Sequence, residues 1–183
     1  MTEPTPNDRS TPAGYTTVAP WVMTDDTAAF LDFAADVFHG EELARVAVEG
    51  GGIGHAEIRI GDTVVLAFDR RPEWPVLPSL LRVFLPDAAE AIERAVERGA
   101  RVVTPVSDSA FGQRGGRISD PWGNLWWVVT VVEDVPEAEM WRRLAEPRYA
   151  EQMRVAQETL DRELSGQSGR SWRPLQAGGP VDG

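Results

Sequence analysis

Apolar and polar residues alternate with two different periods between residues 15 and 135. Two segments have the helical period, with apolar side chains recurring at spacings of three and four. The first is Thr27–Phe38, and the second starts at Ala88 and stops before Gly99. An aspartate precedes each segment and is a typical N-cap. The pattern therefore predicts two amphipathic helices.

The other apolar segments are short and rich in Val, Ile, Trp and Thr, and Gly, Pro, Asp or Asn separates them. This is typical of strands joined by turns. The strands predicted on this basis span residues 16–23, 43–48, 55–60, 63–68, 80–85, 102–106, 117–119 and 125–130.

The two helices occupy corresponding places in a repeated order of elements. The predicted cap Asp26 corresponds to Asp87, and Gly61 corresponds to Gly123 in the last turn of the other half. Both pairs are separated by about 60 residues, which indicates an internal duplication. Each half has the order βαβββ. We therefore predict an α+β fold in which two tandem βαβββ modules form a cupped mixed sheet, followed by a C-terminal helical extension.

The last turn of the second half has the sequence Asp120-Pro121-Trp122-Gly123-Asn124. Pro121 presets φ at the second corner of a turn, and Gly123 or Asn124 can take a positive φ. The carboxylate of Asp120 can accept a hydrogen bond from the backbone two residues on. These residues predict a tight turn between the last two strands.

The repeated pattern of helices and strands sets the limits of the domain. Outside it, the residues either show no periodicity or show only the spacing of a helix. The predicted parts are a disordered leader (1–14), one domain (15–135) made of modules 15–69 and 79–135, a helical extension (136–165) and a flexible tail (166–183).

One apolar stripe runs along the predicted extension. Tyr149, Met153, Ala156 and Leu160 recur at spacings of four, three and four. Packing on the chain's own domain is the first expectation for such a stripe, and packing on a partner subunit is the second.

Charge and composition exclude several classes of function. The net charge of -11 argues against a nucleic-acid or anionic-membrane surface, because phosphate binding needs a basic patch. No apolar run approaches the length of a membrane span, and the N-terminal residues contain no apolar signal segment, so no membrane partner is expected. The absence of cysteine removes disulfides and cysteine nucleophiles, and favours a cytoplasmic location.

The order of elements and the D-P-x-G-N turn resemble the vicinal oxygen chelate superfamily, which includes glyoxalase I, extradiol dioxygenases and the bleomycin-resistance proteins. The segments HAEIRIGDTVV (55–65), SDPWGNLWW (119–127) and VEDVPEAEMWRR (132–143) are similar to the PhnB-like branch. The resemblance covers residues 15–145 and implies the cupped fold with a site in the cup. It does not imply one reaction, since one fold hosts many chemistries.

In that superfamily, His or Gln on the first strand of each module and Glu on the last strand hold a divalent metal. The resemblance places these positions at Ala19, Leu80, Val65 and Trp127. None of these side chains supplies the oxygen, nitrogen or sulfur donors that such a cation needs. We therefore expect no metal and no other cofactor.

If the superfamily's ligand positions face the cup, residues of the same parity along those strands face it too. Flat aromatic side chains suit stacking on a planar ligand, and an arginine suits an anionic or carbonyl group. The alternative is that the aromatic side chains fill the cup as core. The predicted ligand-binding residues are Trp21, Met23, Arg82, Phe84, Trp127 and Val129.

His55 and Glu57 alternate onto one face of a strand and are the candidate acid/base pair or pair of metal ligands. The alternative is a solvated edge. His39 is the only other histidine in the chain, which excludes a His-rich site. Arg114 and Arg117 flank a pair of glycines and are candidates to meet an anion, with plain solvation as the alternative.

These features favour a metal-independent, small-molecule binding protein of the bleomycin-resistance type. It would sequester or carry an aromatic or hydrophobic molecule, such as an antibiotic or a pathway intermediate, because sequestration needs no catalytic group. The alternative is a glyoxalase-like enzyme, either a metal-dependent isomerase, lyase or dioxygenase or a metal-free acid/base catalyst using His55 and Glu57. A third class is an interaction module that uses the C-terminal helices. We also expect a homodimer, because members of the superfamily usually pair.

Overall fold

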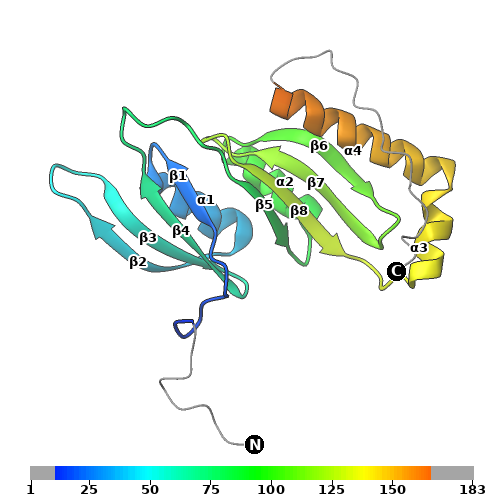
Figure 1. Ribbon diagram of the computed structural model, residues 1–183, viewed down its shortest axis with the longest axis horizontal. Helices are drawn as coiled ribbons and strands as arrows, with labels where there is room; N and C mark the ends of the chain where they lie inside the picture. The colour runs from blue at the N-terminus through cyan, green and yellow to red at the C-terminus, as the bar shows by residue number, and fades with distance from the viewer. Residues whose placement is uncertain (1–10, 166–183) are drawn as a thin grey trace, which may run out of the picture.

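The computed structural model describes residues 11–165, and it shows two βαβββ modules followed by two helices (Figure 1). The first module contains β1 (Trp21–Thr24), α1 (Thr27–Phe38), β2 (Glu41–Ala47), β3 (Ile53–Ile60) and β4 (Thr63–Asp69). The second contains β5 (Leu80–Phe84), α2 (Ala88–Glu97), β6 (Arg101–Asp108), β7 (Gln113–Ser119) and β8 (Leu125–Val131). The extension consists of α3 (Glu137–Leu144) and α4 (Pro147–Ser165).

Each module forms a four-stranded mixed sheet of the same topology. The strand orders are β1-β4-β3-β2 and β5-β8-β7-β6. The first and last strands of each module pair in parallel, and the other neighbours pair antiparallel. The predicted α+β fold of two tandem modules with a helical extension is confirmed.

The same polar contact closes the N-terminus of the helix in both modules. The amide of Thr27 donates to Asp69 Oδ1 at 2.7 Å, and the amide of Ala88 donates to Thr130 Oγ1 at 2.7 Å. Donor and acceptor are displaced along the chain by the same interval between the modules, which matches the predicted repeat. Both predicted aspartate caps also accept backbone amides of the first helical turn.

Helices α1 and α2 pack against each other as well as on their own sheets, so the two modules share one core (Figure 1). Trp122, in the last turn of the second module, packs edge-on against Phe30 and Phe33 of α1. Because side chains alternate along a strand, residues between the buried ones point to the opposite side of each sheet. We call that side the free face.

A buried carboxylate organises the turn that begins at Asp120. Its Oδ1 accepts the backbone amides of Trp122 (3.0 Å) and Asn124 (2.8 Å), and its Oδ2 accepts Asn124 Nδ2 (2.8 Å) and the indole of Trp126 (3.0 Å). Burial raises the pKa of Asp120, and the hydrogen bonds oppose that rise. The indole bond ties the turn to the shared core, because Trp126 is buried there.

Strands β6 and β7 are longer than predicted and leave a short loop at Ser109–Gly112. The glycine pair Gly115-Gly116 has low strand propensity, but β6 and β8 supply hydrogen-bonding partners on both sides of β7. In contrast, β1 begins at Trp21 and is shorter than predicted, since Pro20 before it has no amide proton for a ladder.

Helix α4 packs on its own chain, as first expected for its apolar stripe. It lies along β6, where the hydroxyl oxygens of Thr159 and Thr104 are 2.7 Å apart and Glu163 pairs with Arg101 at 2.6 Å (Figure 1). Tyr149 of the stripe is buried. Within residues 11–165, no helix is both long and apolar enough to cross a membrane.

We predict that replacing Asp120 with Ala lowers the free energy of unfolding by about 2–4 kcal/mol, because buried donors lose their acceptor. Thermal and denaturant unfolding would measure the change. Asp62 is the matched control, since it lies in the corresponding exposed turn and accepts one hydrogen bond, from the Thr63 hydroxyl. Asp62→Ala is expected to change stability by less than about 0.5 kcal/mol. Equal losses in both variants would contradict the role given to Asp120.

Candidate functional site

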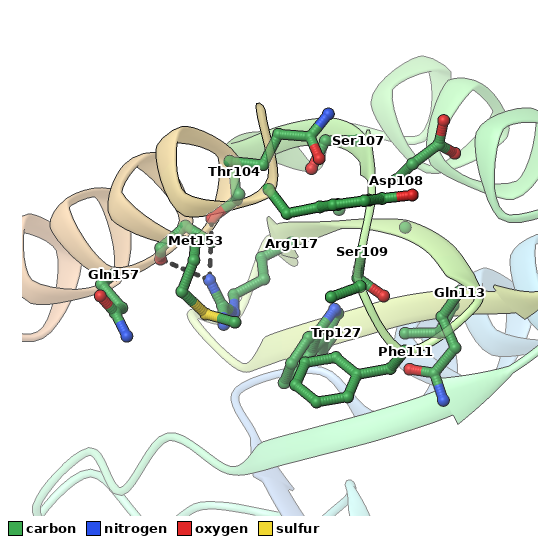
Figure 2. Close-up of a pocket in the computed structure, with 17 residues that line it drawn as sticks. Thr104, Ser107, Asp108, Ser109, Phe111, Gln113, Arg117, Trp127, Met153 and Gln157 are labelled. Atoms are coloured by element: carbon green, nitrogen blue, oxygen red, sulfur yellow. Dashed lines mark hydrogen bonds between the residues drawn. The ribbon is translucent and has the colours of Figure 1, made fainter. Parts of the chain in front are cut away.

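A cavity lies between the free face of the second sheet and α4 (Figure 2). The space between its walls, including the part that opens to solvent, is about 630 Å³. Strands β7 and β8 form its floor, α4 forms one wall, and the loop between β6 and β7 forms another. The principal lining residues are Ser109, Phe111, Gln113, Gly115, Arg117, Trp127, Val129, Tyr149, Gln152, Met153 and Ala156.

Trp127 stands on the floor between two arginines. In the sheet register, Arg82 of β5 lies on one side of Trp127 and Arg117 of β7 on the other. Their guanidinium carbons lie 4.2 Å and 4.4 Å from the centre of the indole. Arg82 also lies 4.8 Å from the ring centre of Phe84. Two cations therefore approach one indole from opposite sides, each with a favourable cation–π contact.

Arg117 is the buried cation of the site, with 8% of its surface exposed. Its Nη1 donates to the carbonyl oxygen of Ala156 in α4 at 2.6 Å and to Thr104 Oγ1 at 3.2 Å (Figure 2). Both acceptors are neutral, and no ion pair of Arg117 with a carboxylate occurs among residues 11–165. Burial, and then the nearby charge of Arg82, lower the pKa of Arg117. An arginine nevertheless stays protonated, so Arg117 carries a positive charge that no carboxylate neutralises in the described residues.

The neighbouring arginines have different surroundings. Arg114 is exposed and forms a solvated ion pair with Asp108, at a distance of 2.7 Å. Arg82 is exposed and donates to Gln113 Oε1, a neutral acceptor. The sequence presents Arg114 and Arg117 as equivalent candidates to meet an anion, and the structure separates them.

The structure divides the predicted ligand-binding residues between the two sheets. Trp127 and Val129 line the cavity, and Arg82 and Phe84 lie beside Trp127 on the same free face. Trp21 and Met23 lie on the first sheet, where they pair with Leu66 and Phe68 of β4. The ligand-binding role of all six residues stays a prediction. The cavity adds Arg117, Ser109 and the side chains of α4.

His55 and Glu57 lie on the first sheet, where His55 Nε2 and Glu57 Oε1 are 2.9 Å apart. Trp21 packs edge-on against the imidazole, with ring centres 5.9 Å apart. Hydrogen bonds from His55 and then Tyr15 lower the pKa of Glu57, and the bond to Glu57 raises the pKa of Tyr15. His55 and Glu57 form a hydrogen-bonded pair on the free face of the first sheet, apart from the cavity lining.

The residues at the implied metal positions do not fit a divalent cation. Leu80 pairs with Leu125 and Trp127 pairs with Arg82, so no carboxylate or imidazole lies there. Val65 points into the shared core, and the free-face residue beside it is Leu66. The part of the chain that the structure describes contains no cluster of three or more His, Cys, Asp or Glu suited to a metal ion.

The fold and this sheet arrangement agree with a family comparison. Residues 14–128 match the family described as the Glyoxalase/Bleomycin resistance protein/Dioxygenase superfamily. The chain belongs to this superfamily. The match ends before α3 and α4, so the wall of the cavity that α4 forms lies outside the matched region.

Two mycobacterial relatives share about a third of the matched sequence with the chain. An uncharacterised protein of Mycobacterium tuberculosis (strain H37Rv) is 30% identical over 129 residues, covering 64% of this chain and 76% of the relative. An uncharacterised protein of Mycobacterium bovis is also 30% identical over 129 residues, covering 64% of this chain and 85% of the relative.

Solved structures of low sequence identity share the fold. TioX from Micromonospora sp. ML1 has a TM-score of 0.52 and 22% identity, covering 66% of this chain and 100% of TioX. The fosfomycin resistance protein FosX from Mesorhizobium loti has a TM-score of 0.51 and 14% identity, covering 70% and 98%. A PhnB protein from Bacillus cereus has a TM-score of 0.50 and 12% identity, covering 63% and 99%.

We predict that Arg117→Met does not lower the free energy of unfolding by more than about 1 kcal/mol, because the variant removes a buried charge that no carboxylate compensates. Denaturant unfolding would measure this. A loss above about 3 kcal/mol would mean that Arg117 serves mainly to hold α4 on the sheet, and would contradict a binding role.

Proposed function

We propose that this protein is a metal-independent binding protein that holds a small aromatic or hydrophobic anion in the cavity beneath α4. The observation that carries the proposal is the guanidinium of Arg117, which is buried at the cavity with neutral acceptors only. A buried charge without a partner costs free energy, and an anionic ligand removes that cost when it binds.

The apolar part of the cavity suits the body of such a ligand. The apolar residues of the lining include Phe111, Trp127, Val129 and Met153. Arginines lie on both sides of the Trp127 ring, so a planar ligand meets the edge of the indole and the guanidinium planes. Apolar walls with a few placed polar groups are typical of small-molecule sites.

Sequestration or transport needs affinity and no catalytic group, which fits the cavity. The described lining contains no histidine, and its single carboxylate, Asp108, is paired with Arg114. The fold neighbours named for fosfomycin resistance support only the view that this fold serves protection from small molecules, because their identity to the chain is low. An antibiotic or a pathway intermediate is the proposed ligand.

We predict that the protein binds trans-cinnamate more tightly than the neutral cinnamyl alcohol, because only the acid supplies an anion to Arg117. Arg117→Met is expected to weaken cinnamate binding by roughly 10- to 100-fold, the value of a charged hydrogen bond. Isothermal titration calorimetry would measure both. Arg59→Met is the matched control and should leave the affinity unchanged, since Arg59 lies on β3, the corresponding strand of the first sheet, and pairs with Glu41 away from the cavity. Equal losses in the two variants would contradict the proposal.

We predict that removing divalent metal with a chelator leaves the affinity for cinnamate unchanged, because the binding groups are guanidinium and apolar side chains. Calorimetry before and after chelation, with metal analysis of both samples, would check this. A loss of binding that an added metal restores would favour the enzyme class instead.

A second candidate function rests on the hydrogen bond between His55 and Glu57 on the first sheet. A carboxylate and an imidazole in contact can move a proton, which suits a metal-free acid/base catalyst of the glyoxalase-like kind. Turnover that is lost in His55→Ala and kept in Arg117→Met would favour this candidate over the binding protein.

A further inference from the structure

Carboxylates neutralise most of the arginines in this chain, but not the two arginines beside Trp127. The chain has no lysine, and its 18 arginines face 29 acidic residues. Within residues 11–165, eleven arginines form an ion pair with a carboxylate. Arg82 and Arg117 instead donate to an amide oxygen, a carbonyl oxygen and a hydroxyl. In so acidic a chain, two such neighbouring cations indicate an anionic partner from outside the chain.

The head group of Arg82 reaches the cavity, although its strand, β5, does not line it. Its guanidinium carbon lies 4.2 Å from the ring centre of Trp127, and its Nη2 donates to Gln113 Oε1. Trp127 and Gln113 both line the cavity (Figure 2). In the sheet register Gln113 pairs with Val131, four residues beyond Trp127 on β8, so the side chain of Arg82 extends across β8 to contact both. Arg82 therefore places a second cation at the edge of the cavity.

The indole of Trp127 keeps the two cations apart. The guanidinium carbons of Arg82 and Arg117 lie 4.2 Å and 4.4 Å from the same ring centre, so the gap between them is no wider than the sum of these distances. The two side chains come from strands on opposite sides of β8. A single small acid group held by one guanidinium is therefore separated from the other by the ring, whereas two acid groups on one aromatic ring can reach both.

The two positive charges destabilise each other when no anion is bound. Burial and the charge of Arg82 lower the pKa of Arg117, and burial lowers the pKa of Arg82. Gln113 positions the guanidinium of Arg82 through a neutral oxygen and leaves its charge in place. A ligand with an acid group on each side of the indole removes both the burial cost at Arg117 and the repulsion between the cations.

We infer that the cavity selects aromatic ligands with two acid groups, one bound by Arg117 and the other by Arg82, over ligands with a single acid group. The inference rests on the proposed function, which needs only Arg117. Arg82 is then the residue that discriminates among anions by their charge. Because Arg82 is exposed, water screens this second contact, and it contributes less than the contact with Arg117.

The test compares terephthalate with its monomethyl ester, which has nearly the same shape and one acid group fewer. Calorimetry on the full chain is expected to show tighter binding of terephthalate by about fivefold, the upper end for an ion pair that is open to water. The net charge of -11 favours the monoanion at long range, so a preference for the dianion reports cations at the site. In Arg82→Met this preference is expected to disappear, because the second acid group loses its partner.

Arg59→Met is the matched control and should keep the preference for terephthalate. It changes the net charge by the same amount as Arg82→Met, and Arg59 pairs with Glu41 on the first sheet. A preference that survives in Arg82→Met, or that Arg59→Met removes as fully, overturns the inference.

The outcomes separate this inference from the proposed function. Equal or weaker binding of terephthalate, with binding of the ester still dependent on Arg117, overturns the site for a second acid group and leaves the anion site standing. Binding of trans-cinnamate without binding of terephthalate has the same meaning. Failure of all three compounds to bind at millimolar concentration, or binding unchanged in Arg117→Met, overturns the proposed function as well.

Discussion

The site depends on the burial of one positive charge without a negative partner. Arg117 is held by cation–π contact with Trp127, by the carbonyl oxygen of Ala156 and by a threonine hydroxyl. These neutral contacts position the guanidinium without neutralising it, and the nearby charge of Arg82 adds repulsion. Proteins usually pair or expose such a group, so the arrangement is costly in the unliganded state. An anion that binds against Arg117 offsets this cost, and the affinity gains from it.

Helix α4 turns an open sheet face into a cavity. The first sheet of the chain has the same topology and an exposed free face with aromatic residues, but the cavity is found on the second sheet, where α4 lies. The helix supplies a wall, an acceptor for Arg117 and the amide of Gln152. The chain thus combines the domain that defines its superfamily with a cavity wall, α4, that lies outside the matched residues. Ligand choice can vary through such an extension without change in the shared fold.

Local signals were sufficient to predict much of the fold. The bounds of α1 follow from its apolar spacing and from the cap at Asp26, and the repeat follows from the matching positions of Asp26 and Asp87 in the two halves. The period of two along β5 and β8 correctly placed Arg82 and Trp127 on one face, because parity depends only on the strand itself.

The cavity depends on contacts between distant residues, and these leave little trace in the sequence. The glycine pair Gly115-Gly116 has a low strand propensity, so the sequence predicts a shorter β7 than the one that pairs with β6 and β8 in the sheet. Arg114 and Arg117 look alike in sequence, but they are three positions apart on β7 and so point to opposite faces of the sheet, and α4 covers the face of Arg117. That Gln152 and Ser109 line the same cavity also becomes visible only in the folded structure. The contact between Arg117 and the indole of Trp127 likewise becomes visible only when β7 is paired with β8.

A crystal structure of the protein with trans-cinnamate would show directly whether the anion site lies beneath α4. We expect the carboxylate to lie within hydrogen-bond distance of the Arg117 guanidinium, with the ring between the second sheet and α4. A ligand bound on the free face of the first sheet, near Trp21 and His55, would contradict it. So would a ligand in the cavity with its carboxylate turned away from Arg117.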